Sequence, residues 1–516
     1  MKGAISDRAV LPAGRQAGVS IHLASLPSPY GIGDIGDSAR SFIEALVDMH
    51  IGVWQFLPTG PTAYGDSPYQ PLSAFAGNEN LIGIEPLLRA GLLLADETVV
   101  LKNLPADFID YSALIPIKNT LLARAAERFR EKVSGGLKSD YEEFLHLHDR
   151  VWLDDYALYR VLKTQHGERP WPKWDEPFVH RDPQAIRNAR TSSTGAIERV
   201  KIIQFLFERQ WQDLRARAVE NRVCLFADMP IYIALDSADA WANRELLRID
   251  DDGRPDFVAG VPPDYFSEDG QLWGNPLYAW EHHEKTAYRW WIDRLRASAA
   301  RADLVRIDHF RGFEAYWSVP ADSETARIGT WEPGPGDAIF AALQDALGEL
   351  PIVAENLGVI TPEVEALRDQ HRIPGMHVLQ FAVTDSGFDF SSIGSNSVCY
   401  TGTHDNDTTI GWFHGDPDDI RTPEEIQAVQ NDALRITGGT PETIHADMIR
   451  AAFSTNATIA IAPLQDYLGL GSESRMNTPG TSSNNWRWRA LDTQLTDAVC
   501  DNVAAMVETA GRLPAR

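Results

Sequence analysis

The chain has 516 residues, 44% of them hydrophobic and 23% charged, a composition that excludes a disordered or collagen-like protein. The 47 Lys and Arg face 73 Asp and Glu, giving a net charge of −26, which argues against nucleic acid or an anionic membrane as partner. The N-terminus shows no apolar leader and no run is long enough to span a membrane, so we predict a cytoplasmic protein.

Eight short apolar runs are typical of strands that are buried on both faces. They cover residues 17–22, 51–57, 221–228, 303–308, 351–355, 376–383, 398–404 and 457–464. Helical patterns separate them, which indicates βαβ units and a parallel sheet. We therefore expect an α/β fold, a (β/α)8 TIM barrel with large inserted subdomains over its C-terminal face. An open, doubly wound sheet is the alternative.

The helical patterns fall at residues 37–50, 199–219, 285–301, 337–347 and 494–509, with a further helix starting at Thr361. Asp37 is expected to cap the first of these, and Thr361-Pro362-Glu363 is a typical helix start. The three cysteines, Cys224, Cys399 and Cys500, show neither CxxC nor zinc spacing, so we expect small buried side chains.

The spacing of the strands is uneven, which defines the expected domain organisation. We treat residues 1–516 as a single catalytic barrel. Residues 59–200 form an expected inserted subdomain between strands two and three, because one crossover helix needs far fewer residues. Residues 233–283 form an expected enlarged substrate-binding loop region.

Four of the eight strands end in acids, namely Asp228, Asp308, Glu355 and Asp405. The carboxyl ends of barrel strands carry the chemistry of this fold, so four acids there indicate a functional site rather than helix caps alone. Carboxylates gathered in this way suit either a metal ion or glycoside chemistry, which needs one ionised carboxylate and one protonated acid.

Basic residues beside the acids favour the glycoside interpretation. Arg306 lies two residues before Asp308, on the same side of the strand, and is expected to keep Asp308 ionised as a nucleophile. Glu355, close to other acids, is expected to have a raised pKa and to donate a proton. Asp405 would then stabilise the transition state.

Aromatic residues in the polar loops also suit a sugar ligand, because sugar rings stack on flat apolar surfaces with polar edges. Trp273 and Tyr69 lie in such loops, and Asn477, Trp486 and Trp488 share the segment 475–489. For any single tryptophan, packing within a loop is the simpler explanation.

Seven segments resemble, in order, those of the amylomaltases, bacterial 4-α-glucanotransferases of the α-amylase superfamily. They are Ser67–Gln70, Phe75–Asn78, Val261–Phe266, Trp273–Tyr278, Arg306–Gly312, Ala354–Gly358 and Thr403–Thr408. The resemblance runs from about residue 21 to about residue 489. It implies transfer of α-1,4-glucan segments, from malto-oligosaccharides among others, to the 4-hydroxyl of glucose or another glucan by a retaining double displacement.

The resemblance also implies roles for individual residues. By matching motif, Asp308 is the nucleophile, Glu355 the acid/base and Asp405 the transition-state stabiliser. The residues implied in substrate binding are Tyr69, Asp228, Trp273, Arg306, His309, Asp385, His404 and Asn477. The family needs no metal and no organic cofactor, and we expect a monomer or a simple homo-oligomer without nucleic-acid or membrane partners.

Two positions depart from the family's pattern: Glu79 stands where Pro is usual, and Asn484 where Gly is usual. Both concern remote subsites rather than the acids. Three alternatives stay open at this point: a hydrolase on the same scaffold, a catalytically inactive glucan-binding protein, and a metal-dependent enzyme.

Overall fold

The computed structural model describes residues 10–62, 64–263, 268–385, 388–416, 419, 421–481 and 483–514. Its central element is an eight-stranded parallel sheet with the order β10-β11-β12-β1-β2-β3-β6-β9. The strands are β1 (Gln16–Ser20), β2 (Val53–Phe56), β3 (Cys224–Pro230), β6 (Leu304–Asp308), β9 (Ile352–Ala354), β10 (Gly375–Val378), β11 (Ser397–Tyr400) and β12 (Ile459–Pro463).

The order of these strands in space follows their order in the chain, and the last strand, β12, pairs with the first, β1. Between β9 and β10, the Ala354 N–H donates to the Pro374 carbonyl at 2.8 Å, which brings the two ends of the sheet together. The strands are short and almost wholly buried, as a sheet covered on both faces requires. The predicted (β/α)8 barrel is confirmed and the open-sheet alternative is wrong.

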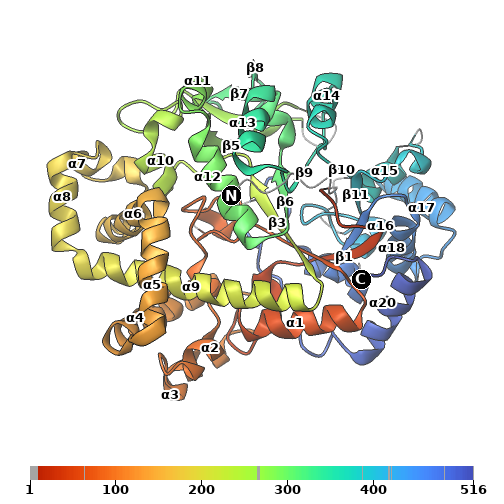
Figure 1. Ribbon diagram of the computed structural model, residues 1–516. Coiled ribbons are helices and arrows are strands. Elements are labelled where there is room, and N and C mark those ends of the chain that lie inside the picture. Colours follow the sequence, from red (N-terminus) through yellow and green to blue (C-terminus); the bar gives the residue numbers. More distant parts are fainter. Residues whose placement is uncertain are drawn as a thin grey trace.

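Helices fill the connections and surround the sheet in Figure 1. Outside the long β2–β3 connection they are α1 (Asp37–Asp48), α10 (Ala238–Ala242), α11 (Trp280–Lys285), α12 (Arg289–Arg301), α13 (Asp337–Leu347), α14 (Pro362–Gln370), α15 (Leu379–Thr384), α16 (Thr409–His414), α17 (Pro423–Thr437), α18 (Ile444–Ser454), α19 (Leu464–Leu468) and α20 (Asp497–Thr509). The predicted bounds 337–347 agree with α13. The pattern at 285–301 corresponds to α12, which starts four residues later than predicted; Lys285 is the last residue of α11. Ala287 and Tyr288, with positive φ angles of 50° and 54°, separate the two helices.

The β2–β3 connection is the longest and lies to one side of the barrel, in orange and yellow in Figure 1. It contains α2 (Ile84–Arg89), α3 (Ala95–Thr98), α4 (Tyr111–Lys132), α5 (Gly135–His148), α6 (Asp154–Gln165), α7 (Glu176–Val179), α8 (Pro183–Ser192) and α9 (Thr194–Glu220). Helix α9 begins five residues before the predicted position 199 and leads directly into β3.

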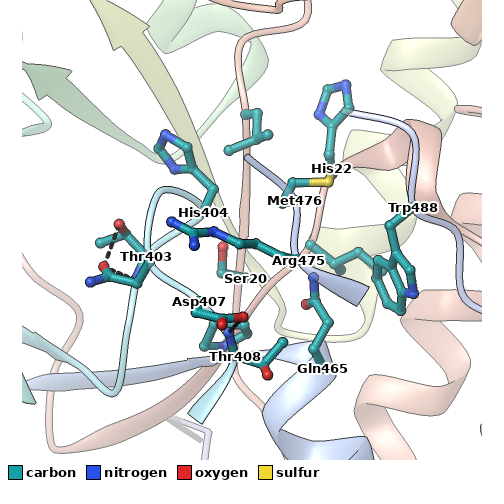
Figure 2. Close-up of a pocket in the computed structure, with 14 residues that line it drawn as sticks. Ser20, His22, Thr403, His404, Asp407, Thr408, Gln465, Arg475, Met476 and Trp488 are labelled. Carbon is teal, nitrogen blue, oxygen red and sulfur yellow. Dashed lines mark hydrogen bonds between the residues drawn. The ribbon is translucent and has the colours of Figure 1, made fainter. Parts of the chain in front are cut away.

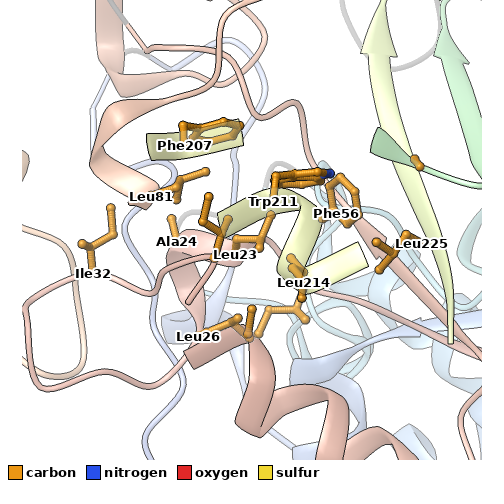
Figure 3. Packing of buried hydrophobic residues seen from close by; sticks show 14 of the residues in the cluster. Leu23, Ala24, Leu26, Ile32, Phe56, Leu81, Phe207, Trp211, Leu214 and Leu225 are labelled. Atoms are coloured by element: carbon orange, nitrogen blue, oxygen red, sulfur yellow. The ribbon is translucent and has the colours of Figure 1, made fainter. Parts of the chain in front are cut away.

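Helix α9 connects this helical region to the barrel through one apolar face. Figure 3 shows Phe207, Trp211 and Leu214 of α9 packed with Phe56 of β2 and Leu225 of β3. The rings of Phe56 and Trp211 meet edge to face at 5.5 Å between centroids. The helical region and the barrel therefore share one hydrophobic core.

A second, antiparallel sheet has the order β5-β4-β7-β8 and was not predicted from the sequence. It consists of β4 (Phe257–Val261), β5 (Gln271–Pro276), β7 (Ala315–Pro320) and β8 (Thr330–Pro333). Residues 233–283, expected to be a loop region, thus contribute two of its strands. Short strands with Gly and Pro give only a weak alternating pattern, which explains why the sequence did not reveal them.

Several predicted ends differ from the structure. The run 376–383 is one strand only to Val378, and its remainder is helix α15, because a short apolar run does not distinguish strand from helix. The run 398–404 leaves the sheet after Tyr400. Asp37 is the first residue of α1, not its cap; the Asp34 carboxylate instead accepts the N–H groups of Gly36 and Ser38.

Pro362 does open α14, as predicted, but the Thr361 hydroxyl makes no capping hydrogen bond. Of the cysteines, all of which are described, Cys399 and Cys500 are buried, Cys224 is half-buried, and none forms a disulfide. Among the described residues, no helix combines the length and the apolarity that crossing a bilayer demands.

Candidate active site

Three of the four acids lie at or near the C-terminal ends of the adjacent strands β3, β6 and β9, as predicted, and the fourth follows β11. Asp308 is the last residue of β6, Asp228 is in β3, and Glu355 follows β9 directly. Asp405 comes five residues after the end of β11, on the connection to α16. The barrel therefore brings chain positions nearly 180 residues apart to one end of the sheet.

Arg306 joins two of these carboxylates. Its Nη1 donates to Asp228 Oδ2 at 2.5 Å and its Nη2 to Asp308 Oδ1 at 2.8 Å. The side chain of Asp228 is 1% exposed, whereas that of Asp308 is 32% exposed and can be approached by a ligand. Arg306 therefore connects the buried Asp228 to the more exposed Asp308.

Burial raises the pKa of Asp308, and the nearby Arg306 guanidinium opposes that rise. The prediction that Arg306 favours the ionised form is right in direction, but burial outweighs the guanidinium in the net result. Among the hydrogen bonds described, the Arg306 guanidinium contacts Asp308 and not Glu355. If one of the two acids is ionised, this contact favours Asp308 over Glu355.

Glu355 is held by two backbone N–H groups. His309 N donates to its Oε2 and Leu357 N to its Oε1, each at 2.7 Å. His309 directs its N–H there with a left-handed φ of 56°, a strained conformation that this hydrogen bond accompanies. Burial, with a smaller contribution from Asp308, raises the pKa of Glu355 from 4.5 to about 7. A carboxylic acid of this kind holds a proton near neutral pH.

Tyr69 links the buried pair to the loop that carries Asp405. Its hydroxyl donates to Asp228 Oδ2 at 2.7 Å, and its ring stacks on His404 with 4.9 Å between centroids. His404 Nε2 lies 3.4 Å from Asp405 Oδ2. Trp486 packs against both rings, at 5.7 Å from Tyr69 and 5.9 Å from His404.

Asn477 lies next to Asp405, where its Nδ2 donates to Asp405 Oδ1 at 2.6 Å. In this structure it therefore orients the carboxylate. Arg475, which the sequence did not single out, donates from Nη2 to the Asp405 carbonyl and from Nε to the Asn477 carbonyl, both at 2.8 Å. It lies within the polar, aromatic segment 475–489, which was the only signal that could have indicated it.

The ring of Trp273 on β5 is perpendicular to the ring of His309, with 4.8 Å between centroids. Because His309 N donates to Glu355, the second sheet contacts a residue that holds one of the acids. His309 is buried, its Nε2 has no partner among the described residues, and burial together with Arg311 lowers its pKa to about 3. It is therefore a neutral imidazole with a free ring nitrogen. Asp385 is exposed directly after α15, and its contact with a glucan stays a prediction.

A small cavity of about 30 Å³ with a mixed polar and apolar lining lies beside His404 (Figure 2). Its walls include His22 after β1, Asp407, Gln465 and Arg475. Such a volume holds about two water molecules. His22 is buried there and its pKa falls to about 3, through burial and the proximity of His404. The sequence analysis missed His22 and Gln465, because a lone polar residue after a strand carries no specific pattern.

The described residues include no group of three or more His, Cys, Asp or Glu arranged to hold a metal ion. The acids of the site are instead hydrogen-bonded to Arg306, to backbone N–H groups and to Asn477.

The two departures from the family's pattern fit their local backbones. Asn484 has a φ of 63°, a left-handed conformation that Gly adopts freely and Asn tolerates. Glu79 opens a short 3-10 helix after the cap Asn78, a position that suits Pro or a first-turn acid. In the motif 261–266, residues 264–266 lie outside the described residues.

Comparisons with known proteins identify the family of the chain. The family model described as 4-alpha-glucanotransferase matches residues 21–494. The chain is 45% identical over 507 residues to a 4-alpha-glucanotransferase of Synechocystis sp., covering 96% of this chain and 98% of the relative. It is 43% identical over 509 residues to that of Thermus thermophilus, covering 97% and 99%.

Among solved structures, the amylomaltase of Streptococcus agalactiae in complex with acarbose superposes with a TM-score of 0.90 at 34% identity. The match covers 96% of this chain and 99% of that one. The family model and the relatives match nearly the whole length of the chain, so the chain belongs to the 4-α-glucanotransferase family.

Proposed function

We propose that Asp308, Glu355 and Asp405 carry out the reaction of this family, the retaining transfer of α-1,4-glucan segments. In the first step an Asp308 carboxylate oxygen attacks the anomeric carbon of the donor and forms an ester bond to it. The glycosidic bond to the leaving 4-oxygen breaks, and Glu355 gives its proton to that oxygen.

In the second step Glu355, now ionised, takes the proton from the 4-hydroxyl of an incoming glucan or glucose. That oxygen attacks the anomeric carbon and the ester bond to Asp308 breaks, which restores both acids. Two inversions retain the α-configuration. The observation that carries the proposal is that the Arg306 guanidinium bonds Asp308 at 2.8 Å, whereas Glu355 accepts from two backbone N–H groups. This difference in surroundings, together with the raised pKa of Glu355, suits an ionised nucleophile beside a protonated acid.

Asp405 is proposed to stabilise the positive charge that develops on the sugar ring. Its support is its place beside His404 and Asn477, where the carboxylate stays partly exposed and its charge contributes to the raised pKa of Asp308. The proposed substrate contacts are those of Tyr69, Asp228, Trp273, Arg306, His309, Asp385, His404 and Asn477. The unpartnered His309 Nε2 and the edge of Trp273 suit a sugar hydroxyl and a ring face.

Malto-oligosaccharides and longer α-1,4-glucans are the proposed donors, with glucose among the acceptors. Hydrolysis is the second candidate, because the chemistry is identical until water or sugar meets the glycosyl enzyme. Incubation with pure maltotriose separates the two. Transfer yields glucose together with longer oligosaccharides, whereas only shorter sugars and a rising number of reducing ends would refute transfer.

Three further points belong to the proposal. A cytoplasmic location suits three cysteines that form no disulfide. We keep residues 59–200 as an inserted subdomain and 233–283 as an enlarged substrate-binding region, supported by the helices of the first and by Trp273 in the second. A monomer or simple homo-oligomer remains our expectation.

A further inference from the structure

We infer that Arg475 is a positioning residue for glucan transfer. It acts through Asp405, because it holds together the backbone segments of Asp405 and Asn477 and so fixes the position of the Asp405 carboxylate. The inference rests on the proposed role of Asp405 as transition-state stabiliser. It concerns a side chain to which neither the sequence motifs nor the roles assigned above give a part in the reaction.

The first observation is that Asp405 lies on a connection without regular structure. Helix α16 starts only at Thr409, and β11 has already ended at Tyr400. Within this stretch, Asp405 N donates to the Thr403 hydroxyl at 3.3 Å, a long hydrogen bond. Local contacts of this kind do not by themselves fix a carboxylate to the fraction of an ångström that catalysis requires.

The second observation is that the guanidinium of Arg475 bonds the backbones of two separate segments. Its Nη2 reaches the Asp405 carbonyl, 70 residues away in the chain, and its Nε reaches the Asn477 carbonyl, both at 2.8 Å. Because the guanidinium is planar and rigid, these two bonds fix the distance and the angle between the two carbonyls.

The third observation connects this arrangement to the carboxylate itself. Asn477 Nδ2 donates to Asp405 Oδ1 at 2.6 Å. Arg475, Asn477 and Asp405 thus form a closed loop of three hydrogen bonds, in which the backbone positions set by Arg475 determine where the Asn477 amide meets the carboxylate. Loss of the guanidinium leaves only the amide contact between the two segments in this loop.

The surroundings of Arg475 support a fixed side chain. It forms part of the wall of the small cavity beside His404, and Figure 2 shows it extending toward the loop of Thr403 and His404. Its charge lowers the pKa values of Asp407 and Asp419, although burial still leaves that of Asp407 raised. Arg475 therefore lies near two acidic side chains and balances part of their charge next to the site.

The test compares Arg475→Ala with Arg475→Lys and with the exposed control Arg435→Ala, which loses a surface ion pair on α17. Steady-state kinetics with maltotriose give kcat and KM separately. For Arg475→Ala we expect kcat to fall about 100-fold with KM within about threefold, since misplacement of a catalytic group by about 1 Å has that effect. Arg475→Lys should lie between, because an ammonium is a point donor and cannot keep both bonds.

The decisive comparison adds Asp405→Asn. If Arg475 acts through Asp405, the double variant Asp405→Asn/Arg475→Ala is no more than about threefold slower than Asp405→Asn alone, measured with a glycosyl fluoride donor. Full additivity, or an Arg475→Ala enzyme with more than half of the normal kcat, overturns the inference. An active Asp405→Asn enzyme would instead refute the proposed role of Asp405.

Thermal unfolding of each variant shows whether a loss of activity is due to unfolding of the protein. Should Arg475→Ala fail to fold, the same kinetic comparison is made with Arg475→Lys, which retains the charge. A folded Arg475→Lys enzyme with an unchanged kcat then contradicts the inference, and a tenfold loss of kcat that disappears in the Asp405→Asn background supports it.

Discussion

Replacement of Glu355 by Gln should change how stability depends on pH. A rise in pKa from 4.5 to about 7 means that the folded protein binds a proton more tightly than the unfolded chain does. Stability from this source is complete below pH 4.5 and is lost as the pH rises through 7. The amount lost is about 3 kcal/mol, because each tenfold change in proton affinity corresponds to about 1.4 kcal/mol.

Gln carries no proton to lose, so Glu355→Gln lacks this term. It also replaces one of the two oxygens that accept from His309 N and Leu357 N, which adds a cost that does not vary with pH. The expected difference between the two proteins is therefore in how the free energy of unfolding changes with pH. Relative to the wild type, the variant should gain about 3 kcal/mol in free energy of unfolding between pH 4.5 and pH 8.

Urea unfolding at a series of pH values measures this difference, with the exposed Glu349→Gln as control. For a chain of 516 residues, thermal scans should show the same trend as about 1 °C per kcal/mol. A difference that stays flat from pH 4.5 to pH 8, or one of opposite sign, would refute the reasoning about a buried, protonated Glu355.

Three further predictions concern the network and the fold. Tyr69→Phe keeps the stack on His404 but removes the hydroxyl bond to Asp228, so kcat/KM should fall about 10- to 100-fold; an unchanged value contradicts the proposed network. Gln204→Leu leaves the buried N–H and C=O of Gly77 unpaired, so the free energy of unfolding measured in urea should fall by about 2–5 kcal/mol. The exposed control Gln427→Leu should change it by less than about 0.5 kcal/mol, and equal effects of the two variants would contradict the prediction. Exhaustive chelation should leave maltotriose turnover unchanged, and a loss restored by added metal would support a metal-dependent enzyme.

The barrel was predictable because its strands are the clearest signal in the chain. The runs 221–228 and 303–308 contain the apolar stretches 223–227 and 304–307, the second interrupted only by Arg306. Each run ends in an acid, so the strand, its direction and the candidate site were predicted from one pattern. The acids Asp308 and Glu355 were found for this reason. Asp405 was found as well, although the strand that was expected to carry it ends at Tyr400.

What the sequence did not reveal depends on contacts between distant segments. The antiparallel sheet joins strands from two different connections of the barrel, and Gly260, Gly274 and Pro276 obscure their alternation. The role of Arg475 rests on two backbone carbonyls, one of them 70 residues away, and a carbonyl has no sequence signature. The pKa of Asp308 results from burial, which raises it, and from the Arg306 guanidinium, which lowers it, and only the folded structure determines which effect is larger.

The central claim is that Asp308 forms a covalent bond to the donor glucan, and trapping that species tests it most directly. In Glu355→Gln, a glycosyl fluoride can still react because its leaving group needs little acid help, whereas the second step lacks its base. Mass spectrometry of the digested protein should then find the peptide that contains Asp308 heavier by one glycosyl group. A modified Asp405 or Asp228 peptide, or no modified peptide while the fluoride is consumed, would contradict the account.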